Sequence, residues 1–220
     1  MPSRLPHTGV VIARDDLPWS LIILTGGSGR RLGGAEKSQI KVGSSTLLER
    51  AITPWPETTE LIVCGPEEPT SRPVIFCRED PPGGGPAAGI AAAIDLVSSD
   101  LVGVLAVDMP WSAPVLLATR QTLMDHPESN LVVPIGPDGR HQLLCSLWRT
   151  ADLRTIVESL GDLHGRPVRD LVERASMVTM PVDPSDSPLL DDIDTPSDVT
   201  RARLRNDEDG DHPTDAQTSN

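Results

Sequence analysis

The stretch that decides the fold is residues 21–37, which read Leu-Ile-Ile-Leu-Thr-Gly-Gly-Ser-Gly-Arg-Arg-Leu-Gly-Gly-Ala-Glu-Lys. It begins with four consecutive apolar residues, Leu21 to Leu24, a run that is typical of a strand buried on both faces of a sheet. A glycine-rich loop follows at once. We therefore expect a buried strand whose carboxyl end opens into a loop that can meet a ligand.

Short apolar runs and helical patterns alternate along the rest of the chain. We expect helices over 46–52, 86–97, 114–124, 153–160, 167–173 and from Thr195 onward. Further strands are expected over 61–64, 74–77, 101–107, 131–135 and 143–148, the last two able to run antiparallel around the polar turn at 137–140. Alternation of this kind predicts an α/β fold with a mostly parallel, open sheet and helices on both of its faces.

Composition excludes several classes of protein. The chain has 220 residues with 19 basic and 32 acidic side chains, a formal net charge of −13, so nucleic acid is not an expected partner. No apolar run of 18 residues occurs and the first twenty residues carry prolines and charges, so we expect neither a membrane span nor a signal peptide. The three cysteines form no metal-binding or disulfide pattern, and we expect reduced thiols in a cytoplasmic protein.

The domain organisation follows from the two ends of the chain. Residues 1–19 form an N-terminal appendage without apolar periodicity, in which 9–13 could pair as an edge strand. Residues 206–220 are rich in acidic and small residues with few apolar ones, so they are expected to form a disordered tail. The folded domain is therefore predicted over 20–205.

The glycine-rich loop is the first candidate site. Its glycines let backbone N–H groups approach a phosphate chain, and Arg30, Arg31 and Lys37 supply neutralising charge. The spacing matches neither a Walker loop nor a dinucleotide fingerprint. A surface loop with scattered charges is the alternative interpretation, which three cations among so many glycines in an acidic chain make less favoured.

Two more polar segments follow expected strands. The loop 78–89 contains Asp80 and runs through three glycines into a helix N-terminus, where free amides offer an anion site; a simple tight turn would look similar. Asp108 follows the apolar run 101–107, and a carboxylate there is costly to bury unless it is paired or holds a cation. Mg²⁺ takes one or two carboxylates together with substrate phosphates, while a capping role for Asp108 is the alternative.

These residues together resemble the molybdenum cofactor guanylyltransferase family over about residues 20–203. That family carries LAGGxxxRMGGxDK, a central D…GPLAG, a DxP at a strand end and a late NTP. The corresponding residues here are 24–27, 31–34, Lys37, Asp80 with 85–89, 108–110 and 194–196. The resemblance implies a three-layer, Rossmann-like sheet of the nucleotide-diphospho-sugar transferase type.

The resemblance also implies an activity and a site. The terminal phosphate of molybdopterin would attack the α-phosphorus of GTP with Mg²⁺, releasing pyrophosphate and forming a guanine dinucleotide cofactor; molybdoenzymes or cofactor-handling proteins would be protein partners. Arg31, Lys37 and Asp108 would be the catalytic residues, and Asp108, with Asp194 as a second ligand, would hold Mg²⁺. The residues that would contact the nucleotide are Leu24, Thr25, Gly26, Gly27, Lys37, Asp80 and Asp108.

The chain departs from the family pattern at several positions. Thr25 replaces Ala, Glu36 replaces Asp, Ala87 replaces Leu, and Asp194 replaces Asn and could repel the triphosphate or bind the metal. Two alternatives therefore stay open: a relative that uses CTP or another phosphate acceptor, and a catalytically weak module that binds a nucleotide or cofactor. A pair of arginines, Arg166 and Arg169, could hold a second phosphate, although solvated helix charges are the favoured interpretation.

Overall fold

The computed structural model describes residues 19–26 and 36–208. The expected edge strand at 9–13, Gly27, Arg31 and most of the predicted acidic tail lie outside these ranges. The division into an appendage, a domain over 20–205 and a tail therefore remains a proposal.

The described residues build a seven-stranded sheet in the order β5-β4-β1-β6-β8-β7-β9. The central strand β1 lies between β4 and β6 and is buried along its whole length, which explains its unbroken apolar run. The strands are β1 (Trp19–Leu24), β4 (Glu60–Cys64), β5 (Ile75–Cys77), β6 (Leu101–Ala106), β7 (Leu131–Ile135), β8 (Cys145–Arg149) and β9 (Met177–Pro181).

Strand β8 is the one strand of this seven-stranded sheet that runs against its neighbours. It pairs antiparallel with both β6 and β7, whereas β1, β4, β5 and β6 pair in parallel and β9 is parallel to β7. The antiparallel pairing of β7 with β8, expected from the turn at 137–140, is confirmed. The carboxyl ends of the other six strands meet along one edge, where ligands bind in open α/β sheets.

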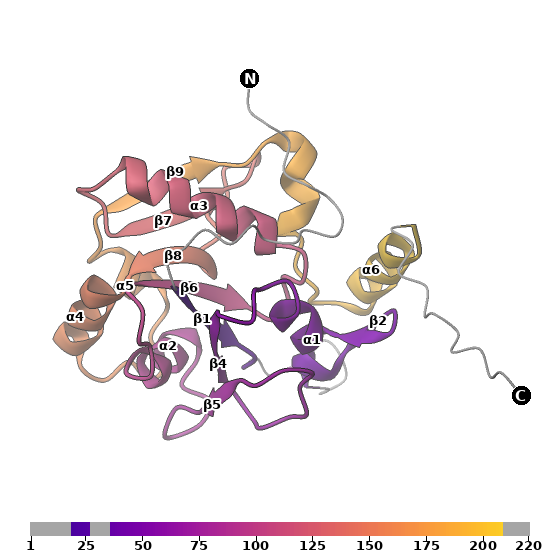
Figure 1. Ribbon diagram of the computed structural model, residues 1–220, viewed down its shortest axis with the longest axis horizontal. Helices are drawn as coiled ribbons and strands as arrows, with labels where there is room; N and C mark the ends of the chain where they lie inside the picture. Colours follow the sequence, from indigo (N-terminus) through magenta and orange to yellow (C-terminus); the bar gives the residue numbers. More distant parts are fainter. Residues whose placement is uncertain (1–18, 27–35, 209–220) are drawn as a thin grey trace, which may run out of the picture.

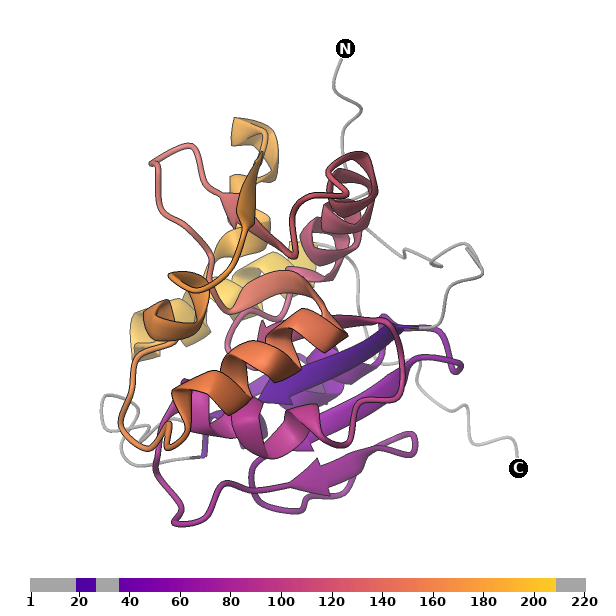
Figure 2. The ribbon, with the colours of Figure 1, turned by 90° about the vertical axis from the view of Figure 1, so that its left-hand side faces the viewer.

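Helices cover both faces of the sheet and create two hydrophobic cores. On one face α1 (Leu47–Ile52) and α3 (Ala113–Asp125) pack, with the 3₁₀ segment η3 (Pro184–Leu190), against side chains of β1, β4 and β6. On the other face lie α2 (Pro86–Ile94), α4 (Thr150–Leu160) and the short α5 (Arg169–Val172). Figure 2 shows α4 and α2 lying along each other over this second face. The predicted three-layer α/β fold is confirmed.

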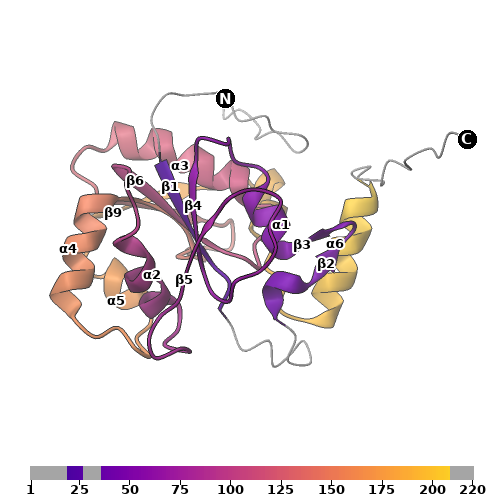
Figure 3. The same ribbon diagram turned by 60° about the horizontal axis from the view of Figure 1, so that its bottom comes forward.

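A small subdomain extends from one side of the sheet. The hairpin β2 (Lys41–Val42) and β3 (Ser45–Thr46) lies beside the last helix, α6 (Pro196–Glu208), opposite α4 (Figures 1 and 3). Backbone and side-chain bonds join the two elements: Arg203 donates to the Lys41 carbonyl at 3.2 Å, and Arg50 donates both to the Val42 carbonyl and to Asn206. Helix α6 is thereby tied to the segment that carries Lys37.

Within the described ranges the predicted elements are present, together with several others. The hairpin β2–β3, the edge strand β9 and the 3₁₀ segments η2 (Lys37–Gln39) and η3 were not expected. The predicted helix at 86–97 ends earlier, at Ile94, and the predicted helix at 167–173 is shorter, at Arg169–Val172. Among the described helices, none has the length and apolar character needed to cross a membrane.

Candidate functional site

Asp108 lies where β6 ends. The strand is fully buried through Ala106, and a tight turn follows in which the Met109 N–H donates to the Ala106 carbonyl at 3.1 Å. This turn keeps the Asp108 side chain at the carboxyl edge of the sheet, with 20% of it exposed. Its backbone carbonyl accepts a bond from the Ile193 N–H at 2.9 Å, which brings the segment before α6 to the same place.

Lys37 is held by the short helix η2. The Ile40 N–H donates to the Lys37 carbonyl at 3.1 Å, and the next residue, Ser38, is buried and donates to Glu68 at 2.6 Å. The side chain of Lys37 is 14% exposed and its Nζ donates to Asp108 Oδ2 at 2.6 Å. Nζ also donates to Asp194 Oδ1, so a single ammonium joins the two carboxylates.

Asp194 is positioned by the start of α6. The Asp198 carboxylate accepts from the N–H groups of Asp194 at 3.1 Å and Thr195 at 2.8 Å. In return the Asp198 N–H donates to Thr195 Oγ1 at 3.3 Å, which completes a capping box with Pro196 as the first helical residue. Thr195 thus caps the helix that was expected to begin at this residue, and the cap fixes the backbone that carries Asp194.

The three charged side chains are coupled electrostatically. Burial is the main cause that raises the pKa of Asp108, and the bond from Lys37 offsets this rise only in part, while the negative charges of Asp194 and Asp192 add to it. Burial alone would lower the pKa of Lys37, but the bonds and charges of Asp108 and Asp194 together leave that pKa above its ordinary value. The site therefore holds a charged ammonium between two acidic groups. The capping alternative for Asp108 does not describe this geometry, since its carboxylate binds Lys37.

This arrangement fits a magnesium ion. Asp108 and Asp194 direct oxygens at one shared point, and hard carboxylate oxygens are the ligands that Mg²⁺ prefers. In the part of the chain that the structure describes, no cluster of three or more His, Cys, Asp or Glu side chains could hold a metal. A cation at this point would take two protein carboxylates at most and would complete its shell with water and substrate oxygens.

The end of β1 forms the neighbouring part of the site. Thr25 is buried, and both its N–H and its hydroxyl donate to the Cys64 carbonyl, at 3.1 and 3.0 Å. Thr25 stands where the family has alanine, and its hydroxyl fills the space that a Cβ at Gly65 would take. Glycine at position 65, just after β4, therefore accommodates the larger side chain. Gly26 is exposed beyond it. Among the described residues no backbone N–H donates to the Thr25 carbonyl, so this oxygen can accept from a ligand.

Helix α2 approaches this edge closely. A Cβ at Gly89 would lie 3.1 Å from Leu24 and 3.2 Å from the Cys64 sulfur, so glycine lets the helix pack directly on β1 and β4. The preceding loop turns through Gly83 and Gly85, whose φ angles of 87° and 85° disfavour other residues. Among the described residues no side chain caps the helix, which leaves the amides of its first turn for an anion.

Asp80 lies in the same loop and is exposed. The loop follows β5, which is three strands away from β6 in the sheet. At about 4.8 Å between neighbouring strands, the ends of β5 and β6 are separated by roughly 14 Å along the edge. The predicted nucleoside residue thus follows the outer strand β5 and the predicted metal residue follows the middle strand β6, with Thr25 and Gly26 at the end of β1 between them.

The candidate arginine pair and three tryptophans each have a clear place in the fold. Arg166 and Arg169 are exposed, and Arg166 lies 3.5 Å from Asp170, as the interpretation of solvated helix charges predicts. Trp19 and Trp55 pack edge to face with ring centres 5.1 Å apart, and Trp148 is buried. Gly27 and Arg31 lie outside the described ranges.

Sequence reasoning missed two residues that hold the site together. Glu68 anchors η2 through Ser38 and Gln39, and no motif marks it in the sequence. Asp198 accepts from the Asp194 backbone N–H, a contact that the expected helix start at Thr195 did not by itself indicate. The spacing of Thr195 and Asp198 is that of a capping box and was the signal that could have revealed this contact.

The chain was compared with known protein families and curated sequences. A family model described as MobA-like NTP transferase domain matches residues 21–178. The molybdenum cofactor guanylyltransferase of Mesorhizobium japonicum is 30% identical over 195 residues, which cover 82% of this chain and 92% of that protein. The protein of the same name from Rhizobium johnstonii is 26% identical over 190 residues, covering 82% of this chain and 90% of the other.

Solved structures share the same fold. Molybdopterin-guanine dinucleotide biosynthesis protein A from Archaeoglobus fulgidus superposes with a TM-score of 0.67 at 21% identity, covering 86% of this chain and 99% of that one. For 2-C-methyl-D-erythritol 4-phosphate cytidylyltransferase from Thermus thermophilus, the TM-score is 0.60 at 20% identity, with 84% and 96% covered. The expected nucleotide-diphospho-sugar transferase type of fold is confirmed.

Proposed function

The chain belongs to the family of MobA-like NTP transferase domains and is a nucleotidyltransferase, and from this premise we propose that it transfers GMP from GTP to the terminal phosphate of molybdopterin. The observation that carries the proposal is the Lys37 ammonium held between Asp108 and Asp194 at the carboxyl edge of the sheet. A site with one cation and two metal-binding carboxylates suits a reaction between two phosphates. The names of the curated relatives support the choice of substrates.

The reaction needs positioning and charge neutralisation more than a protein nucleophile. An oxygen of the pterin's terminal phosphate attacks the α-phosphorus of GTP, the bond from that phosphorus to the bridging oxygen breaks, and pyrophosphate leaves with the electron pair. Asp108 and Asp194 would hold Mg²⁺, which when bound supplies positive charge to the phosphate oxygens. Lys37 would bind the phosphate chain and stabilise the charge that develops on it.

The remaining contacts are proposals about where the nucleotide lies. Leu24, Thr25 and Gly26 would border it at the end of β1, Asp80 would accept from its nucleoside part, and the first turn of α2 would face an anionic group. Gly27 and Arg31 are proposed from the sequence alone. We also propose a cytoplasmic location and delivery of the product to molybdoenzymes or cofactor-handling proteins.

The test is pyrophosphate release measured with GTP, CTP, ATP and UTP, each with and without Mg²⁺ and with and without molybdopterin. We expect release that is confined to GTP and requires both Mg²⁺ and the pterin. Release with CTP or another nucleotide instead would refute the guanine assignment. No release with any nucleotide, while GTP still binds, would refute the enzyme activity and favour a binding module.

A further inference from the structure

Lys37 lies where a divalent cation would bind. Its Nζ contacts Asp108 and Asp194 at the shared point of their two carboxylates, and its side chain is 14% exposed. Within the described ranges, these two carboxylates form ion pairs only with Lys37. A metal that takes the same oxygens as ligands must therefore compete with the ammonium.

We propose that Lys37 is a built-in competitor for the divalent cation, so that metal and nucleotide bind this site together rather than the metal binding first. The inference rests on the proposed function and describes how its site is regulated. In the free protein the ammonium occupies the carboxylates. When the phosphate chain arrives, it offers Lys37 a replacement partner, and the carboxylates become free for the metal.

The balance of charge supports this order. Two carboxylates and one ammonium leave a local charge of minus one, and adding a divalent cation while the ammonium stays would make it plus one at a half-buried point. Several negative charges on a triphosphate offset that excess. Moving the ammonium to the phosphates requires only rotation of the lysine side chain. Its stem of four carbons is flexible, and the ammonium at its end carries three N–H donors.

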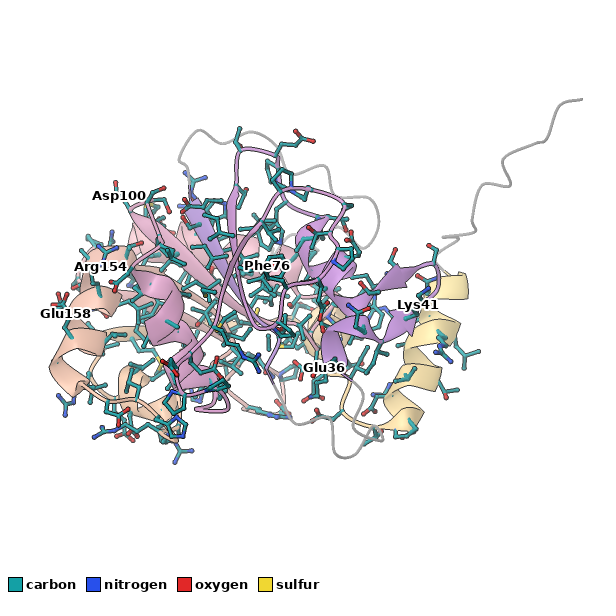
Figure 4. The ribbon with its side chains drawn as sticks, turned by 90° about the horizontal axis from the view of Figure 1, so that it is seen from below. Glu36, Lys41, Phe76, Asp100, Arg154 and Glu158 are labelled. Atoms are coloured by element: carbon teal, nitrogen blue, oxygen red, sulfur yellow. The ribbon has the colours of Figure 1, made fainter. Side chains whose placement is uncertain are left out.

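The composition of the chain makes a direct test possible. Lys37 and Lys41 are the two lysines among 220 residues. Lys41 is exposed on β2, beside α6 (Figure 4). Within the described ranges it forms no ion pair with either carboxylate, so it reports on bulk effects. Selective isotope labelling of lysine therefore gives two side-chain resonances, and the spectrum of Lys41→Met, a change at the exposed lysine, assigns them.

The first experiment follows these resonances in the wild-type protein. We expect the Lys37 resonance to keep its position in millimolar Mg²⁺ alone, and to shift when Mg²⁺ and GTP are present together. The Lys41 resonance should move in neither titration. A Lys37 resonance that shifts equally with Mg²⁺ alone, or that stays in place while GTP and Mg²⁺ are shown to bind, overturns the proposal.

The second experiment measures metal binding directly, with Mn²⁺ detected by electron paramagnetic resonance. Without nucleotide, Lys37→Met should bind Mn²⁺ about tenfold more tightly than the wild type, while Lys41→Met should match the wild type. GTP should strengthen Mn²⁺ binding in the wild type by a factor in the usual range of about 5–150 for coupled sites, and by much less in Lys37→Met. Equal or weaker Mn²⁺ binding by a folded Lys37→Met protein overturns the proposal, and the wild-type resonances decide the matter if that variant does not fold.

The two proposals fail separately. If no nucleotide supports pyrophosphate release but Lys37 still excludes Mn²⁺, the reaction is refuted and the competition stands. If GTP and molybdopterin give Mg²⁺-dependent release but Lys37→Met binds Mn²⁺ no better than the wild type, the competition is refuted and the function stands.

Discussion

At the scale of single residues, Asp108 is placed for function at a cost in stability. Its pKa is raised chiefly by burial, so the folded protein binds its proton more tightly than the unfolded chain does. By linkage, the folded state is favoured when Asp108 is protonated, and this contribution is lost as pH rises through the folded pKa. At neutral pH the charged carboxylate therefore lowers the free energy of unfolding.

We predict that Asp108→Asn uncouples stability from activity. Mg²⁺-dependent turnover should fall by about 100-fold or more, the scale seen when a group that stabilises a transition state is removed. The difference in free energy of unfolding, variant minus wild type, should increase as pH rises from about 4 toward 7. Thermal unfolding at several pH values measures this difference.

The matched control for that prediction is Asp191→Asn, which removes an exposed carboxylate from the segment before α6. It should keep Mg²⁺-dependent turnover, since Asp191 is not part of the site. If Asp108→Asn gives a difference in free energy of unfolding that does not change with pH, burial does not raise the pKa of Asp108. If it keeps metal-dependent turnover, Asp108 does not hold the metal.

At the scale of elements, the capping box of α6 joins helix stability to the position of Asp194. Hydrogen bonds, first of all the one from the Thr195 hydroxyl, lower the pKa of Asp198. A carboxyl with a lowered folded pKa contributes stability that is present above its unfolded pKa, near 3.9, and is lost as pH falls through the folded pKa. The start of α6 should accordingly weaken in acid.

We predict that Asp198→Ala lowers the free energy of unfolding by about 1 kcal/mol at pH 7, the usual effect of losing a helix cap. The loss should shrink as pH falls below about 3.9, the unfolded pKa, and through the lowered folded pKa, where the wild-type carboxyl takes up its proton. Chemical denaturation at pH 7 and pH 3 measures both values. Thr200→Ala, an exposed change within the same helix, is the control and should have a smaller effect; an equal effect would contradict the capping role.

The pairing of β4 with β5 makes a second prediction at this scale. Cys64 and Cys77 are opposite each other in these parallel strands, and their contact lowers the pKa of Cys77 while it raises that of Cys64. Burial raises the pKa of Cys145 to about 12. The thiolate is the reactive form of cysteine, and Cys77 is half-buried whereas Cys64 and Cys145 are buried. We therefore predict that Cys77 is the one thiol of the three that an aromatic disulfide reagent labels quickly.

Labelling kinetics near pH 8 check this order. One fast thiol is expected in the native protein, with the other two reacting after denaturation. Cys77→Ala should abolish the fast phase and Cys145→Ala should leave it intact. A fast phase that persists in Cys77→Ala would show that another cysteine is the reactive one.

The elements also show what sequence reasoning could and could not predict. Strongly apolar elements such as β1 and β6 were predicted because their central places in the sheet require unbroken apolar runs. Strand β9 was missed because it is an edge strand that is half exposed and ends in proline, so it carries neither an apolar run nor a clean alternation. The two-residue strands β2 and β3 are too short for any periodicity.

The candidate site divides in the same way. Asp108 and the glycine-rich loop were found from the residues, because both follow buried strands whose carboxyl ends share an edge. Asp194 entered only through the family resemblance, since 157 residues separate it from Lys37 and no local pattern reports that contact. The shared ammonium was a finding of the structure.

At the scale of the whole molecule, the net charge of −13 opposes the approach of a polyphosphate. Local cations and a metal must overcome this repulsion. Two carboxylates at the site add to it until a divalent cation neutralises them. Binding of GTP should therefore depend on Mg²⁺ far more than on any single hydrogen bond.

We predict that thermal unfolding shows this dependence. A ligand present at 100 times its dissociation constant stabilises the folded state by about 2.7 kcal/mol, which for a chain of this size raises the melting temperature by roughly 5–10 °C. GTP with Mg²⁺ should give a shift of this size. GTP alone should give a much smaller one, and Mg²⁺ alone almost none, because Lys37 already pairs with the carboxylates.

Two variants and one salt series separate the causes. Lys37→Ala should lose most of the shift with GTP and Mg²⁺, whereas Lys41→Ala, which removes the same charge from an exposed position, should keep it. Added potassium chloride should reduce the shift, since it screens the attraction between the phosphates and the site. An equal shift in Lys37→Ala would show that Lys37 does not bind the phosphates. A full shift with GTP in the absence of any divalent cation would show that the two carboxylates do not repel the phosphates. The metal would then not be needed for nucleotide binding.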